Sequence, residues 1–220
     1  MKQVPSPNFD KRKSAINMLL FHYTGRPTLD ESLAWLTDRD KKVSAHYLIG
    51  ETGEIYQLVP EGMRAWHAGV SYWAGNIDIN SCSIGIEIQN PGHEFGYQDF
   101  STKQIEALVS LSKEIIARHS IPRTRVLGHS DVAPTRKFDP GEKFPWEMLS
   151  REGIGRWPEK VSRASIPDLQ TFKTSLEDLG FEVLQGKVEV AIKAFQRHWH
   201  PENVTGQPNA ETFARLKALL

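Results

Sequence analysis

Alternating runs of apolar and polar residues along the first 150 positions predict strands interleaved with helices. The apolar run at 16–24 and the alternating segment at 83–89 are typical of strands in a sheet interior. Residues 45–49 and 55–59, joined by a Glu-Thr-Gly-Glu turn, predict a hairpin. Strands that alternate with helices indicate an α/β fold in which helices flank a mixed central β-sheet.

Two helices are predicted from their start signals. Thr28 with Glu31, and Ser101 with Gln104, have the spacing of a capping box, which predicts a helix after each pair. The second helix is expected to extend to about His119, because apolar residues recur on one of its faces up to that point.

The pattern changes after residue 150. Residues 151–165 mix Gly, Pro and charged side chains without a period, which predicts a linker. From 166 to 220, three short apolar stripes at helical spacing predict a small three-helix C-terminal domain. A unit of roughly 55 residues is marginally stable alone, so we expect it to pack against its neighbour, the α/β domain at 1–150.

The composition is that of a soluble globular protein, with 39% hydrophobic and 25% charged residues. The 27 basic and 27 acidic residues balance and form no long basic stripe, so we expect no nucleic-acid partner. No apolar run approaches the roughly 18 residues of a membrane span, so we expect no membrane-spanning segment. We also expect a monomer. The single cysteine, Cys82, excludes an intrachain disulfide and a multi-cysteine zinc cluster.

The first 15 residues, MKQVPSPNFDKRKSA, bear on the location of the protein. They contain no apolar h-region and no cysteine for lipid attachment, so they are not a signal peptide as written. We expect a cytoplasmic protein from the chain as written, or a periplasmic or cell-envelope protein if the chain is a mature or trimmed form.

Candidate metal ligands come from two distant segments. His129 and Asp139 lie in GHSDVAPTRKFDPG (128–141), whose prolines predict a stiff loop, and His22 lies in the apolar strand MLLFHYTG. Two histidines and one aspartate leave the fourth position of zinc open, as in catalytic zinc sites. Taken singly, His22 is more typical of a buried core residue and Asp139 of a turn residue, so the hypothesis depends on the set.

Glu87 and Lys137 are candidates for the chemistry beside such a metal. In the strand SIGIEIQ, Glu87 shares a face with Gly85 and Gln89, opposite three isoleucines. A carboxylate there either lies on a solvent-exposed face of the sheet or takes a proton from a metal-bound water. Lys137 is either a surface residue or a cation that stabilises an oxyanion.

A loop with the sequence RAWHAG (64–69) is a candidate for substrate binding. Arg64, Trp66 and His67 there, with Trp73 nearby, offer a surface suitable for stacking a sugar ring or for filling a core. The remaining histidines are poorer candidates for the site. His119 lies at the end of a predicted helix. His198 and His200 lie on a C-terminal helix and have no partner motif, and His93 lies in a Pro-Gly turn.

Together these motifs resemble the zinc-dependent N-acetylmuramoyl-L-alanine amidases, whose fold is shared with phage amidase-lysozymes and peptidoglycan recognition proteins. The resemblance covers about residues 16–150, and its separate motifs stand in the family's order. They are FHYT at 21–24, SAHYLI at 44–49, GEIYQLVP at 53–60, RAWHAG at 64–69, SIGIEI at 83–88 and GHSDVAPTRKFDPG at 128–141.

The resemblance implies one zinc ion per chain, with residues 1–150 as the catalytic domain. By matching position it implies that the ligands are His22, His129 and Asp139. It implies further that Glu87 is the general base and Lys137 the oxyanion stabiliser. Asp131 corresponds to a supporting position, and Thr135 departs from the family's usual glycine, which we expect to alter the loop but not the ligand set.

The resemblance also implies a substrate and a role for the C-terminal helices. The expected reaction is hydrolysis of the amide bond between N-acetylmuramic acid, or its anhydro form, and L-alanine, on polymeric peptidoglycan or on small muropeptides. A recognition module without activity and a zinc peptidase that acts on the stem peptide are the alternatives. AIKAFQRHWHP at 191–201 and VTGQPNAETFARL at 204–216 resemble a peptidoglycan-binding module, which either binds the wall or buttresses the catalytic domain.

Overall fold

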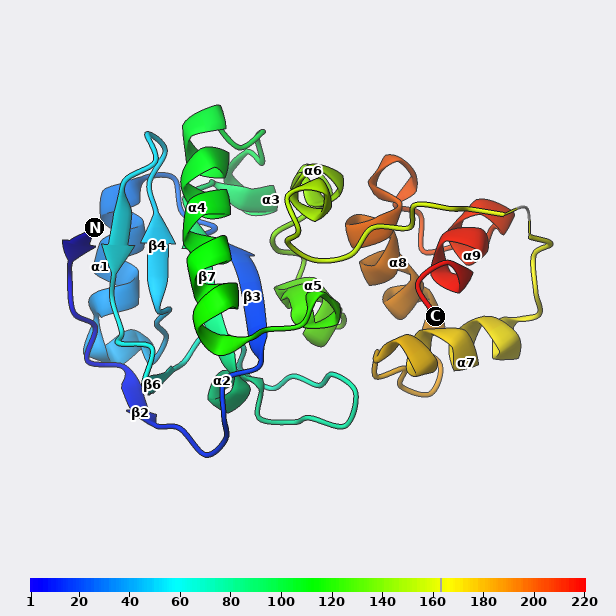
Figure 1. The fold of residues 1–220 in the computed structure, drawn as a ribbon, viewed down its shortest axis with the longest axis horizontal. Coiled ribbons are helices and arrows are strands. Elements are labelled where there is room, and N and C mark those ends of the chain that lie inside the picture. Colours follow the sequence, from blue (N-terminus) through cyan, green and yellow to red (C-terminus); the bar gives the residue numbers. More distant parts are fainter. Residues whose placement is uncertain (163) are drawn as a thin grey trace.

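A mixed sheet of six strands lies at the centre of the computed structural model, which describes residues 1–162 and 164–220 (Figure 1). The strands in spatial order are β1 (Lys2–Gln3), β5 (Ile55–Gln57), β4 (Tyr47–Ile49), β7 (Ser83–Ile88), β3 (Met18–Tyr23) and β8 (Val126–Gly128). Only the predicted hairpin, β4 with β5, is antiparallel within this sheet. Two further strands, β2 (Phe9–Lys11) and β6 (Met63–Ala65), pair separately. The predicted α/β fold with a mixed central sheet is confirmed.

Helices α1 (Leu29–Thr37) and α4 (Thr102–His119) lie on opposite faces of the sheet (Figure 1). The predicted capping box of α4 is complete: Ser101 Oγ accepts the Gln104 N–H at 3.1 Å, and Gln104 Oε1 accepts the Ser101 N–H at 2.9 Å. Thr28 Oγ1 accepts the Glu31 N–H at 3.2 Å and begins α1. No helix in the described ranges is long and apolar enough to cross a membrane.

The alternation of side chains along β3 and β7 separates the core from the site. Leu19 and Phe21 of β3 and the three isoleucines of β7 pack against α4 in one buried cluster. The opposite faces of the same two strands carry His22 and Glu87, which are neighbours in register on parallel strands. Burial of one face therefore places both functional side chains on the other.

Short helical segments connect the main elements. They are α2 (Ile79–Cys82), α3 (Gly92–Phe95), α5 (His129–Val132) and α6 (Trp146–Arg151), with the 3-10 turns η1 (Arg39–Lys41), η2 (Arg123–Arg125) and η3 (Pro201–Asn203). The stiff loop predicted for 128–141 is wrong at its start, because one helical turn, α5, begins there. The Asp131 carboxylate accepts the Gly128 N–H at 2.7 Å and holds this turn in place.

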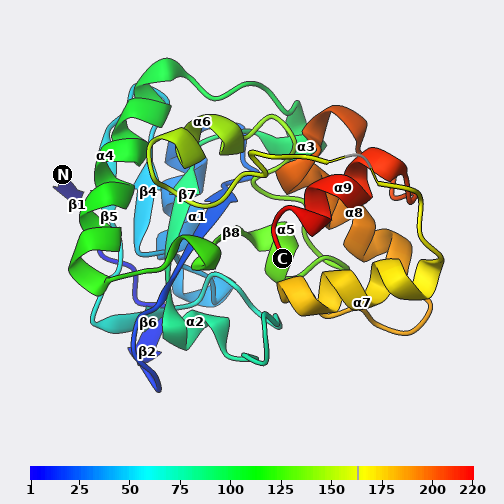
Figure 2. The same ribbon diagram turned by 45° about the vertical axis from the view of Figure 1, so that its right-hand side comes forward.

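Three helices, α7 (Leu169–Leu179), α8 (Val188–Trp199) and α9 (Ala210–Lys217), form the C-terminal part as predicted. They gather on the side of the sheet where α5 lies (Figures 1 and 2). Phe195 and Trp199 of α8 belong to the same buried cluster as Met18 and Leu20 of β3. The C-terminal helices and the sheet thus share a hydrophobic core. The linker predicted at 151–165 includes residue 163, which lies outside the described residues.

Candidate active site

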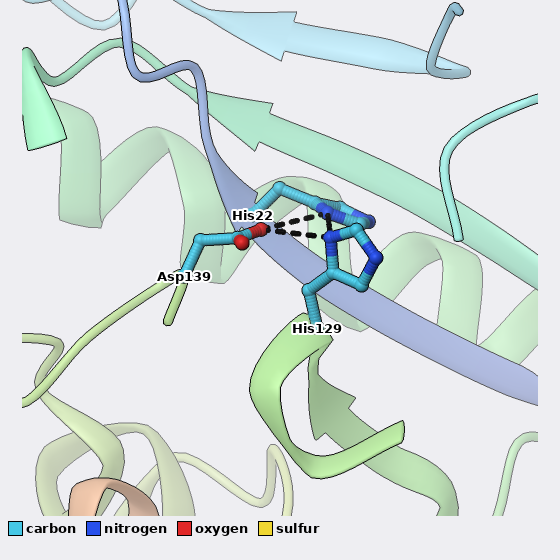
Figure 3. Close-up of side chains that lie close together, drawn as sticks. All are labelled: His22, His129 and Asp139. Atoms are coloured by element: carbon cyan, nitrogen blue, oxygen red, sulfur yellow. Dashed lines mark hydrogen bonds and ion pairs between the residues drawn. The ribbon is translucent and has the colours of Figure 1, made fainter. Parts of the chain in front are cut away.

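The side chains of His22, His129 and Asp139 converge on one point (Figure 3). They come from the end of β3, the first turn of α5 and the loop that follows α5. The two Nδ1 atoms lie 3.0 Å apart, and each lies 3.0 Å from Asp139 Oδ2. All three side chains are buried. Segments more than a hundred residues apart therefore meet as the sequence analysis predicted.

This donor set fits a zinc ion. Two imidazole nitrogens and one carboxylate oxygen are typical zinc ligands, and bonds of about 2.05 Å at tetrahedral angles place neighbouring ligand atoms about 3.3 Å apart. The observed 3.0 Å separations are close to that value. Three protein ligands leave one position for water or substrate.

The charge states of the group suit a cation. Burial, and then the neighbouring His129, lower the pKa of His22 to about 4, so its imidazole is neutral at pH 7. Burial alone would raise the pKa of Asp139, but the His129 and His22 imidazoles lower it below its ordinary value. A neutral imidazole and an ionised carboxylate are the forms that bind a metal.

Another group that meets at metal-binding distances, in the described part of the chain, lies at the C-terminus and has a different explanation. His200, Glu202 and Glu211 approach one another there. The guanidinium of Arg215 already pairs with both carboxylates. This cation accounts for the cluster without a metal.

Glu87 lies beside the His-His-Asp group as a half-buried residue, with one carboxylate oxygen, Oε2, shielded from solvent. Its Oε2 has no hydrogen-bond partner among the described residues. Burial, and then the negative charge of Asp139, raise its pKa well above the ordinary 4.5, while Lys137 opposes the shift. A buried carboxylate with a raised pKa is suited to accept and return a proton.

An open pocket of about 660 Å³ connects these residues to the surface. Glu87, His129 and Asp139 line it, together with three residues that the sequence analysis proposed, namely Lys137, Trp66 and His67. His67 is only 7% exposed. Its ring is directed toward His22 instead of the open part of the pocket, with its Nδ1 3.1 Å from His22 Nε2.

Arg64, the remaining substrate-binding candidate, lies outside this pocket. Its guanidinium pairs with Asp78 at 2.8 Å and with Asp10 at 3.3 Å, across the small sheet of β2 and β6. Arg64 belongs to strand β6, whereas Trp66 and His67 follow its end, so the alternation of the strand does not set the direction of their side chains.

Several pocket residues were missed by the sequence analysis. Arg26 and Trp35 form one edge, where the guanidinium lies 3.7 Å from the indole centroid. Leu36, the next residue of α1, is buried, but adjacent helical residues point in different directions and Trp35 is exposed. His93 is exposed and lies at another edge of the pocket with Phe138.

Two histidines that were set aside have partners. His119 lies 2.5 Å from Glu61 at the end of α4. His198, which was set aside because the sequence shows no partner motif for it, places its Nδ1 2.7 Å from Asp131 Oδ2. No local signal could reveal a contact between residues 67 positions apart. Asp131 is thus not among the three converging ligands, in agreement with its expected supporting position.

The fold and this site define a hydrolase of the α/β class with a buried metal-ligand group in an open pocket. Residues 12–142 match the family model described as N-acetylmuramoyl-L-alanine amidase. The chain belongs to this family of enzymes, and the amidase activity expected from the sequence is confirmed at that level.

Relatives match over different lengths of the chain. N-acetylmuramoyl-L-alanine amidase AmiD of Escherichia coli is 40% identical, over 93% of this chain and 82% of AmiD. The 1,6-anhydro-N-acetylmuramyl-L-alanine amidase AmpD of Haemophilus influenzae is 34% identical, over 66% of this chain and 88% of AmpD.

Solved structures agree with the whole described fold. The E. coli AmiD complex with the substrate anhydro-N-acetylmuramic acid-L-Ala-D-gamma-Glu-L-Lys superposes with a TM-score of 0.85 at 37% identity, covering 96% of this chain and 91% of AmiD. AmpDh3 of Pseudomonas aeruginosa with anhydromuramic pentapeptide gives 0.79 at 34% identity, covering 92% and 90%. Such coverage leaves few residues unmatched, so these likenesses include the C-terminal helices.

Proposed function

We propose that this amidase is a zinc-dependent hydrolase that cleaves the amide bond between N-acetylmuramic acid, or its anhydro form, and L-alanine of the stem peptide. The convergence of His22, His129 and Asp139 beside the half-buried Glu87, in an open pocket that Glu87, His129 and Asp139 line, is the observation that carries this proposal. The anhydro-muropeptides bound to AmiD and AmpDh3 support small anhydro-muropeptides as substrates.

The three converging side chains would hold one zinc ion per chain. At pH 7 the neutral imidazole of His22 and the ionised carboxylate of Asp139 are already in the forms that bind a metal. A zinc ion held there supplies Lewis acidity, which activates a water molecule and polarises the scissile carbonyl.

Glu87 moves the proton in this mechanism. Its carboxylate accepts a proton from the attacking water and then delivers it to the nitrogen of L-alanine as the carbon–nitrogen bond breaks. The products are a lactyl carboxylic acid on the sugar and a free amine on L-alanine. The raised pKa of Glu87 suits both transfers, because the group must hold a proton at neutral pH for part of the cycle.

Lys137 stabilises charge that develops on the carbonyl oxygen. Lys137 precedes Asp139 by two residues, and its side chain lines the pocket together with Glu87 and Asp139. A fixed cation in a partly dehydrated pocket stabilises an oxyanion more strongly than water does. Trp66 lines the same pocket and offers an aromatic face for the sugar.

Product analysis tests the function. Zinc-loaded protein is incubated with insoluble peptidoglycan and, separately, with a soluble anhydro-muropeptide, and product masses are measured. We expect free stem peptide with an amine on L-alanine. Fragments of the stem peptide that keep the muramyl–alanine bond would identify a peptidase, and binding without product would identify a recognition module. Either result would overturn the proposal.

Variants assign the roles within it. His129→Ala should lose zinc, because only two of the three converging ligand side chains remain. Glu87→Gln should keep about one zinc per chain and lose about 10²–10⁴-fold in turnover. Stoichiometric zinc in His129→Ala would contradict the ligand assignment, and near-normal turnover of Glu87→Gln would contradict the role of the base.

A further inference from the structure

The two residues His67 and Ala68 lie directly behind the histidines of the site, and each contacts one of them. His22 Nε2 lies 3.1 Å from His67 Nδ1. His129 Nε2 lies 3.0 Å from the carbonyl oxygen of Ala68. Both contacts involve the ring nitrogen that is directed away from Asp139, so one short segment contacts the outer edges of both rings.

The direction of the hydrogen bond at His129 follows from its acceptor. A carbonyl oxygen only accepts, so His129 Nε2–H donates to Ala68. In the neutral form of the ring the lone pair is then on Nδ1, the atom that faces His22 and Asp139. The contact with Ala68 thus selects the tautomer that a metal requires.

A chain of three hydrogen bonds determines the direction at His22 in the same way. Ser83 donates its hydroxyl hydrogen to the carbonyl oxygen of Ile79 at 2.6 Å, so its Oγ accepts from His67 Nε2–H at 3.2 Å. His67 Nδ1 is then the acceptor for His22 Nε2–H. The backbone carbonyl at the end of the chain leaves the lone pair of His22 on Nδ1, toward the site.

The segment itself is anchored from below. Asn80 Oδ1 accepts the backbone N–H groups of His67 at 3.0 Å and of Ala68 at 2.7 Å. Asn80 is buried, as are His67 and Ser83. A Cβ atom at Gly85 would lie 2.5 Å from the His67 ring, so the strand beneath the ring requires glycine there.

We propose that the His67–Ala68 segment, anchored by Asn80, fixes the tautomer and orientation of both metal-ligating histidines, and that His67 is a positioning residue. This inference rests on the metal site of the proposed function. It assigns His67 a role other than the substrate binding expected from its sequence motif. Outer hydrogen bonds of this kind typically contribute about 10–100-fold to metal affinity.

A matched pair of variants tests the role of His67. Asn and Leu have nearly the same shape, but only Asn retains an acceptor near the position of the histidine Nδ1. Zinc affinity at pH 7 is measured by competition with a chromophoric chelator, alongside the wild type. We expect His67→Leu to bind zinc about 10–100-fold more weakly, and His67→Asn to recover most of this loss.

Ser83→Ala provides a second test that does not alter the ring. It removes the hydroxyl that accepts from His67 Nε2–H, and we expect zinc affinity to fall by about tenfold. The folding of every variant is checked by thermal melting without metal. If His67→Leu does not fold, the zinc affinity of Ser83→Ala decides whether His67 has the positioning role.

The outcomes separate this inference from the proposed function. Wild-type protein that binds no zinc would refute the metal site itself. Wild-type protein with one zinc per chain, combined with unchanged affinity in His67→Leu and Ser83→Ala, would refute the positioning role only. A raised KM at unchanged zinc affinity in His67→Leu would likewise overturn it, because that pattern identifies a substrate-binding residue.

Discussion

His198 Nδ1 lies 2.7 Å from Asp131 Oδ2, and both side chains are buried. Asp131 also accepts the N–H of Gly128, immediately before the metal-ligand candidate His129. The C-terminal helix α8 is therefore joined, through one carboxylate, to the turn that carries His129. The His198 ring is stacked on Trp146 with centroids 3.6 Å apart, which fixes it further.

Removing His198 should destabilise the whole protein. Burial lowers the pKa of His198, so at pH 7 a neutral imidazole donates to the Asp131 carboxylate. A hydrogen bond to a buried charge contributes about 1.5–3 kcal/mol, and we expect His198→Ala to lose at least that in urea unfolding. A double-mutant cycle with Asp131→Ala isolates the pair. A coupling energy near zero would contradict the contact.

Deleting residues 166–220 should unfold or strongly destabilise the remaining chain. The deletion exposes apolar residues of the α/β part that the C-terminal helices cover, among them Met18, Leu20, Leu127 and Val132. We expect a lower melting temperature and loss of hydrolysis of a soluble muropeptide. A detachable wall-binding module predicts the opposite: unchanged melting and soluble activity, with weaker sedimentation on insoluble peptidoglycan.

Glu87→Gln should stabilise the metal-free protein at neutral pH. The folded state raises the pKa of Glu87 well above 4.5, mainly through burial, so above pH 4.5 the unfolded chain releases a proton that the folded protein retains. Stability of the wild type therefore falls as pH rises past 4.5, and glutamine removes this dependence. We expect the variant to melt higher at pH 7.

The pH series supplies the check on this prediction. The difference in melting temperature between Glu87→Gln and wild type should disappear below about pH 4, where both states hold the proton. The exposed Glu159→Gln is the control and should show no such dependence. A Glu87→Gln variant that melts lower than the wild type at pH 7 would contradict the prediction.

Arg64→Ala should leave kcat and KM for a muropeptide nearly unchanged. Arg64 pairs with Asp78 and Asp10 away from the pocket, in partly exposed ion pairs that contribute about 1 kcal/mol or less to stability. Trp66→Ala, in the pocket, is the comparison and should raise KM. A large rise in KM for Arg64→Ala would return this residue to the substrate site.

Local patterns were enough to predict the main helices of this fold and four strands of its central sheet. The capping box of Ser101 and Gln104 involves atoms three residues apart, so the sequence contains the whole interaction. Alternation along β7 likewise determines that Glu87 faces away from the isoleucines, whichever helix covers them. The set of His22, His129 and Asp139 could be proposed because its residue types are specific for a metal and its motifs resemble a family.

Other features depend on how distant segments pack, and only the tertiary structure decided them. Asp131, the partner of His198, is 67 residues away in the sequence. The role of His67 depends on its contact with Nε2 of His22, the ring nitrogen directed away from Asp139. Arg64 and Trp66 lie two residues apart, yet Arg64 pairs with Asp10 across the small sheet of β2 and β6, and Trp66 lines the pocket. Such contacts form because buried polar groups need hydrogen-bond partners in the folded protein, and the spacing of residues along the sequence does not predict which distant partner each group finds.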